Sequence, residues 1–189
     1  MQTKVINTYA VEELTGNARE KALAWLREGL DYEWWDFIFE DAKKCAECLG
    51  IEIDKIYFSG FWSQGDGACF KGKYAYRKGW KKALKGYAPM DKELLKIGQA
   101  LQDLQKPLFY NAQCDISCND RYFRTSGDFY WNDPTPEDIQ EDFSQLFTDF
   151  ASWIYEQLAK EYDWLSSEEC LIEDAKANDW CFDSEGRIV

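Results

Sequence analysis

The stretch IEIDKIYFSGFWSQGDGACFKGKYAY, from Ile51 to Tyr76, shapes the predicted fold more than any other part of this 189-residue chain. Its two ends, 51–59 and 68–76, are rich in β-branched and aromatic residues, a composition typical of strands. The middle contains three glycines, Gly60, Gly65 and Gly67. Glycine is favoured where a backbone turns or is approached closely. We therefore predict two strands in a hairpin-like arrangement, joined by a shaped loop that presents Phe61 and Trp62.

Part of this stretch resembles a motif of known proteins. The segment SGFWSQGDGACF, Ser59 to Phe70, is similar to the SGFxSQGDGAxF motif of a family of small, uncharacterised proteins encoded by phages and prophages. The similarity extends to ELTGNAREKALAWL, Glu13 to Leu26, and to WIYEQLAKEY, Trp153 to Tyr162, and so covers most of the chain. The resemblance implies a phage protein that acts in a bacterial cytoplasm, and it implies no activity, ligand or catalytic residue.

Apolar residues at helical spacing predict helices in most of the remaining sequence. We expect them at 15–30 with Thr15 or Asn17 as cap, at 32–49 ending before Gly50, at 78–85, at 91–105, from Pro136 to about Leu158 after a Thr135 cap, and from a Ser166–Glu169 capping box to about Asn178. Capping residues at the starts and glycine at an end are the usual boundary signals.

Alternating polar and apolar residues predict further strands at 3–9, 108–117, 121–131 and 180–188, the middle two joined through Asn119 and Asp120. The prediction is a single α+β domain over residues 1–189. It has an antiparallel sheet of about four to six strands, covered by about five to six helices.

The composition indicates a cytoplasmic protein. No apolar run approaches the roughly 18 residues that a membrane span requires, and the first residues lack the apolar core of a secretory signal. Seven scattered cysteines indicate reduced thiols rather than a disulfide framework.

Metal binding has one arrangement in its favour. Cys45, Cys48, Cys114 and Cys118 provide the four thiolates of a structural zinc site, but the first two fall inside a predicted helix, where buried free cysteine is more typical. The chain contains no histidine, the commonest metal ligand and the usual general base near neutral pH. We expect no metal and no cofactor.

Charge is distributed unevenly along the chain. The net charge is −13, which disfavours nucleic acid and anionic membranes as partners, because both are polyanions, and favours a basic protein surface. Residues 128–189 contain seventeen acids and three bases, whereas residues 71–92 contain eight bases and one acid.

The acids around the helix that follows Thr135 have two interpretations. The candidates are Asp133, Glu137, Asp138, Glu141, Asp142, Asp149 and Glu156. They are typical of a solvated helix face, and the first of them also suit a helix N-terminus. Alternatively, the row imitates the phosphates of a nucleic acid and occupies the basic groove of a host protein. The absence of lysine and arginine from 128–159 favours mimicry, since typical surfaces intersperse both signs.

The basic segment also has two interpretations. Lys81, Lys82 and Lys85 either solvate a short helix and attract the acidic end of the same molecule, or follow a phosphate backbone while neighbouring aromatics stack on bases. Alternation in GKYAYRKGW weakens the second interpretation, because it places Tyr74 and Tyr76 on a buried sheet face. We expect no direct binding of DNA or RNA.

The central loop offers Phe61, Trp62, Ser63, Gln64 and Asp66 as candidate residues. Asp66 is typical of an Asx turn, and the loop is either structural or a binding epitope. A catalytic alternative pairs Asp66 with Asp115 or Asp128 as general acid and base on a sugar or nucleotide.

The leading functional hypothesis is a phage-encoded, non-enzymatic inhibitor of a host defence or nucleic-acid-handling machine, similar in action to an anti-CRISPR protein. Its acidic face and central loop would bind a basic site on the host protein. A carboxylate-dependent enzyme and an antitoxin-like regulatory partner are the alternatives. We assign no catalytic residue from the sequence.

Overall fold

A computed structural model describes residues 7–30, 33–61, 63–130 and 135–189. Over these residues the protein is α+β, as predicted, with a four-stranded antiparallel sheet and six α-helices. The chain divides into two compact units, one of residues 35–159 and one that combines 1–34 with 160–189. This division does not test whether the parts fold independently, so the single domain stays a prediction. None of the described helices is long and apolar enough to cross a membrane.

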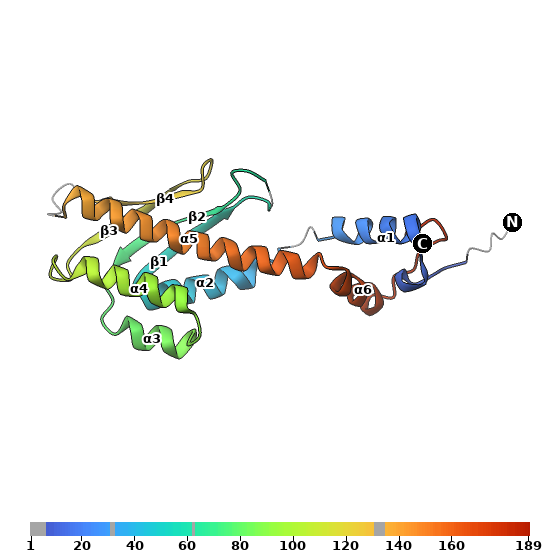
Figure 1. The fold of residues 1–189 in the computed structure, drawn as a ribbon, viewed down its shortest axis with the longest axis horizontal. Helices are drawn as coiled ribbons and strands as arrows, with labels where there is room; N and C mark the ends of the chain where they lie inside the picture. The colour runs from blue at the N-terminus through green and yellow to red at the C-terminus, as the bar shows by residue number, and fades with distance from the viewer. Residues whose placement is uncertain (1–6, 31–32, 62, 131–134) are drawn as a thin grey trace. The chain divides into compact units, whose positions relative to one another are not determined.

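The sheet lies in the unit of residues 35–159 and has the order β1-β2-β3-β4 (Figure 1). The predicted hairpin is confirmed: β1 (Ile51–Phe58) pairs with β2 (Ala68–Ala75), with Phe58 opposite Ala68. Next to β2 lies β3 (Gln113–Asn119), which pairs in turn with β4 (Arg124–Phe129).

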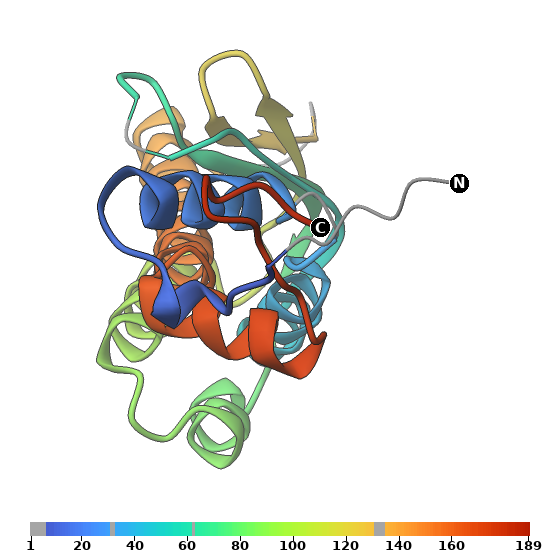
Figure 2. The ribbon, with the colours of Figure 1, turned by 90° about the vertical axis from the view of Figure 1, so that its right-hand side faces the viewer.

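One face of this sheet is packed against helices and the other is polar. Within this unit, the helices α2 (Asp36–Leu49), α3 (Trp80–Tyr87) and α4 (Lys92–Gln105) and the part of α5 (Glu137–Leu165) up to residue 159 lie on the same side of the sheet (Figures 1 and 2). The buried Phe70 ring lies 5.7 Å from that of Phe150 on α5. On the opposite face, Lys71, Lys73 and Ser126 are exposed. This alternation is what an antiparallel sheet with one solvated face requires.

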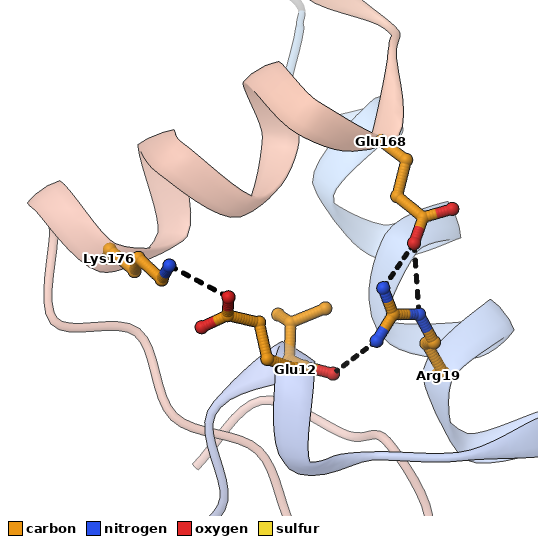
Figure 3. A network of polar contacts seen from close by, with 5 residues as sticks. Glu12, Arg19, Glu168 and Lys176 are labelled. Carbon is orange, nitrogen blue, oxygen red and sulfur yellow. Dashed lines mark hydrogen bonds and ion pairs between the residues drawn. The ribbon is translucent and has the colours of Figure 1, made fainter.

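The second unit contains η1 (Val11–Glu13), α1 (Gly16–Glu28) and α6 (Glu168–Ala177). Its core cluster is apolar and consists of Val11, Leu14, Ala22, Leu23, Leu26, Leu171, Ala175 and Phe182. Two ion pairs join its segments, as Figure 3 shows: Arg19 binds Glu168, and Lys176 Nζ lies 2.8 Å from Glu12 Oε1. Both pairs are partly exposed, so each contributes no more than about 1 kcal/mol.

Two strand predictions were too long. β3 begins at Gln113 instead of Leu108, because residues 108–111 form turns in which Phe109 and Tyr110 have positive φ. The buried Gln105 side chain holds this turn: its amide donates to the Ala112 carbonyl at 2.7 Å and accepts from the Ala112 N–H at 3.2 Å. β4 begins at Arg124 instead of 121, since the connection extends through residues 120–123.

Predictions near the chain ends also need correction. Residues 180–188 form only isolated bridges, from Phe182 to Tyr9 and to Ile188, and of the predicted strand 3–9 only residues 7–9 are described. The predicted capping box at Ser166 is wrong, and a single serine cap at Ser167 takes its place. Ser166 donates its N–H to the Tyr162 carbonyl and so continues the end of α5, while the Ser167 hydroxyl accepts from the Cys170 N–H and caps α6.

Candidate functional site

Six of the acidic residues of α5 share one side of the helix. Glu137, Asp138, Glu141, Asp142 and Glu156 are exposed, and Asp149 is half-buried and accepts a hydrogen bond from Gln145 Nε2 at 2.8 Å. At 3.6 residues per turn, these six acids fall within an arc of about 140°. The buried residues of α5, among them Phe143, Phe147 and Phe150, lie on the remaining side of the helix. The seventh predicted acid, Asp133, lies outside the described residues.

Four of these acids form a compact group, which we call the α5 acidic patch: Glu137, Asp138, Glu141 and Asp142. In the described part of the chain, none of the four forms an ion pair. At 1.5 Å per residue, they span about 8 Å of helix axis. The patch therefore concentrates negative charge on a short surface that is not neutralised within the described parts of the molecule.

A polar groove runs beside this patch, between α5 and the edge strand β4. Its volume is about 870 Å³, and Glu137 and Glu141 line it on the helix side, with Arg124 on the strand side. Gln140, Ser144, Gln145 and Ser126 add amide and hydroxyl groups to the lining. Besides Arg124, the groove thus combines two carboxylates with neutral donors and acceptors, and its helix side suits a polar or cationic side chain.

Side chains of α5 fix the edge of β4 within the groove. The Gly127 N–H donates to Ser144 Oγ at 3.0 Å, and Thr148 Oγ1 donates to the Thr125 carbonyl at 2.9 Å. The buried Thr125 Oγ1 has no hydrogen-bond partner among the described residues. Ser144 and Thr148 were not among the residues predicted from the sequence, although their spacing of four residues beside the apolar stripe of α5 was a usable signal.

The central loop is organised around Asp66. One carboxylate oxygen accepts from Ser59 Oγ at 2.9 Å and the other from the Ser63 N–H at 2.6 Å, while the Gly67 N–H donates to Ser59 Oγ. Of the three loop glycines, only Gly65 has a positive φ, of 95°. Asp66 therefore holds the loop through residues that precede it, and not through the predicted Asx turn, in which the carboxylate accepts from a backbone N–H two residues further along.

Phe61 is not presented to solvent as predicted. It is half-buried, because its ring stacks on Tyr155 of α5 with centroids 5.5 Å apart, and the Tyr155 hydroxyl donates to the Gly60 carbonyl at 3.2 Å. Burial, followed by the nearby Asp66 charge, raises the pKa of Tyr155. Ser63 and Gln64 are exposed, and Trp62 lies outside the described residues. The loop is thus anchored on α5.

The predicted pairing of Asp66 with Asp115 or Asp128 does not form. Asp115 lies opposite Lys73 on β2, five residues along the strand from Ala68, where the loop ends. At about 3.3 Å per residue, these strand positions are about 17 Å apart. Instead, Asp115 lies opposite Asp128 in the β3–β4 register, on the polar face of the sheet.

The four cysteines of the zinc alternative lie on two elements. Cys45 and Cys48 are on α2, and Cys114 and Cys118 are on β3. Over the described ranges, no group of three or more cysteine, aspartate or glutamate side chains is arranged to hold a metal ion. Burial raises the pKa of the Cys45 thiol to about 12, which keeps it protonated and a poor ligand.

Comparison with known proteins identifies a family without an assigned role. Residues 34–168, which contain the acidic patch, the groove and the central loop, match a family model described as "Domain of unknown function (DUF8835)". No curated protein matches the chain. No solved structure matches it.

Proposed function

The chain belongs to the DUF8835 family, and we propose that it is a non-enzymatic binding protein whose α5 acidic patch occupies a basic, nucleic-acid-binding surface on another protein. The observation that carries this proposal is the patch itself: four acids on about 8 Å of helix axis, without an ion pair in the described residues. The net charge of −13 extends the same field over the molecule and would accelerate association with a basic partner.

The spacing of the acids supports mimicry of a short piece of nucleic acid. Duplex DNA carries one charge per about 1.7 Å of axis, and the four carboxylates of the patch reach about one per 2 Å. Over the full length from Glu137 to Glu156, six acids on about 29 Å of axis are sparser than a DNA strand. The patch would therefore replace about four phosphates of a duplex, not an extended stretch of it.

The polar groove adds specificity to this charge. Glu137 and Glu141 stand on its helix side, next to the amides of Gln140 and Gln145. A lysine or arginine of the partner that normally binds a phosphate would meet a carboxylate and neutral acceptors here. The proposed partner is thus a protein with a basic cleft, and direct binding of DNA or RNA is not part of the proposal.

The biological setting follows from the motif between Ser59 and Phe70. Its resemblance to phage and prophage proteins supports a role in the bacterial cytoplasm, as an inhibitor of a host defence or nucleic-acid-handling machine of the kind that anti-CRISPR proteins block. No cofactor or metal enters this proposal.

Affinity capture from a bacterial lysate tests the proposal with a charge-reversed variant. Glu141→Lys with Asp142→Lys changes the patch, and each new lysine lies four residues after an acid, an arrangement that supports the helix. Glu20→Lys with Glu28→Lys on α1 makes the same change in net charge at exposed positions outside the patch.

We expect the wild type and the α1 variant to capture a nucleic-acid-handling protein in a salt-sensitive manner, and the α5 variant to lose it. Capture that is equal for all three proteins, or that recovers no nucleic-acid-handling protein, would count against the proposal.

A carboxylate-dependent enzyme is the second candidate, and one observation favours it. Asp115 and Asp128 are cross-strand partners, and two neighbouring carboxylates are the arrangement that glycoside hydrolysis uses. If this candidate is correct, Asp128→Asn abolishes hydrolysis of the sugar or nucleotide substrate and leaves unchanged the capture of the partner protein from lysate. Full activity of that variant would remove this candidate.

A further inference from the structure

A second groove, on the α3–α4 helical pair, has the opposite charge to the α5 acidic patch. Its volume is about 600 Å³, and four lysines line it: Lys81 and Lys85 from α3, and Lys92 and Lys96 from α4. Leu95 and Ala100, both half-buried, form its apolar floor. We call this surface the α3–α4 groove.

The lysines of this groove form no ion pair within the described residues, although the charge of Lys81 acts on Asp103 at longer range. Lys85, Lys92 and Lys96 form no ion pair there, and Lys81 Nζ donates to the neutral Gln99 at 3.3 Å. The acid that lines the groove, Asp103, is bound to Lys106 at 2.6 Å. Each helix also carries its two lysines four residues apart, an arrangement that destabilises a helix. The positive charge is thus concentrated in a protein whose net charge is −13.

We propose that the α3–α4 groove binds an acidic amphipathic helix of another protein. Such a helix places its apolar stripe on Leu95 and Ala100 and its flanking carboxylates beside the lysine rows. Charge complementarity and the apolar floor both favour this occupant. A nucleic-acid duplex would meet the lysines but leave the floor without an apolar contact, and the net charge of the molecule would repel it.

This inference is independent of the proposed function. The α5 acidic patch takes a basic surface and the α3–α4 groove takes an acidic one, so the two sites differ in the sign of their partner. A mutation that abolishes binding at one site leaves the other site intact. Failure of the proposal for the α5 acidic patch therefore does not imply failure of the proposal for the α3–α4 groove.

Fluorescence anisotropy with a defined peptide tests the groove. The probe is a labelled helical peptide of about four turns, with leucines at one face and glutamates on both flanks. Its first control has serine in place of each leucine, and a labelled DNA duplex is the second. The test variant is Lys85→Glu with Lys92→Glu. Its matched control is Lys78→Glu with Lys82→Glu, which makes the same charge change at exposed positions outside the groove.

We expect the leucine peptide to bind the wild type and the matched control, and to bind the groove variant at least about tenfold more weakly. The serine peptide should also bind at least about tenfold more weakly than the leucine peptide. Absence of binding at millimolar peptide, equal loss in both variants, or tighter binding of the duplex than of the peptide would overturn the proposal. So would a wild-type dimer in light scattering that the groove variant alone abolishes, because the occupant would then be a second copy.

Discussion

Asp91 makes two stabilising interactions, and its sequence context indicates only one of them. Its Oδ1 accepts from the N–H groups of Glu93 and Leu94 and so caps α4, while its Oδ2 accepts from the indole N–H of the buried Trp153 on α5 at 2.8 Å. The sequence placed the helix start at this residue correctly. The bond to Trp153 could not be predicted, because it joins positions 62 residues apart that meet only in the folded chain.

Replacing Asp91 by alanine removes both interactions. We predict that Asp91→Ala lowers the free energy of unfolding by about 2–3 kcal/mol, because a helix loses its cap and a buried indole N–H loses its acceptor. Asp91→Asn keeps an oxygen for the cap and should lose less than Asp91→Ala. Urea denaturation followed by circular dichroism measures both values. Equal stability of the wild type and the alanine variant would show that the cap and the indole bond contribute nothing.

Cys45 gives a prediction on pH. Burial, followed by the charge of Asp41, raises the pKa of its thiol to about 12. The pKa of this thiol is higher in the folded than in the unfolded protein. Its contribution to the free energy of unfolding is therefore complete below the ordinary thiol pKa, and it is lost as the pH rises from that value towards 12. We predict that iodoacetamide leaves Cys45 unmodified at pH 8 until the protein is unfolded, since the thiolate is the reactive form. Peptide mass spectrometry reads this out, and rapid native labelling would contradict the assigned burial.

At the scale of elements, periodicity predicted the β1–β2 hairpin and the start of α5 well, although α5 ends at Leu165 instead of near Leu158. α5 has one apolar stripe over eight turns, and the hairpin has two alternating runs around a glycine-rich loop. The start of β3 could not be predicted in the same way. The residues before it are aromatic and resemble a strand, and the turn at 108–111 depends on the buried Gln105, whose contacts are tertiary.

Of the two adjacent serines before α6, Ser167 caps the helix and Ser166 does not. We predict that Ser167→Ala lowers the stability by about 1 kcal/mol, because its hydroxyl caps α6. Ser166→Ala is the matched control and should change the stability by no more than about 0.5 kcal/mol. Thermal or chemical denaturation of the two variants provides the comparison. A larger loss from Ser166→Ala would restore the capping box that the sequence indicated.

At the scale of the whole molecule, the sequence predicted the uneven charge and the acidic side of α5. The division into two compact units was not predicted. One unit combines the two ends of the chain, which are far apart in the sequence. Six acids share one side of α5, as the apolar stripe of this helix indicated, whereas the stacking of Phe61 on Tyr155 joins positions that meet only in the folded chain. The use of the loop as a binding epitope stays a prediction.

The continuous helix α5 leads us to expect cooperative unfolding. It runs from Glu137 to Leu165 and so contributes residues to both units, which meet in the sequence between 159 and 160. We predict a single calorimetric transition whose enthalpy equals the van't Hoff value, as for one domain. Two resolved transitions would instead assign the units to separate domains.

The central claim, that the α5 acidic patch takes the place of nucleic acid on a basic protein, is tested most directly by displacement of DNA. A labelled duplex is bound to the purified partner that affinity capture identifies, and its release is followed by fluorescence anisotropy as this protein is added. We predict that the wild type releases the duplex and that Glu141→Lys with Asp142→Lys requires at least about tenfold more protein for the same release. A duplex that stays bound at saturating wild-type protein, or a variant as effective as the wild type, would contradict the account.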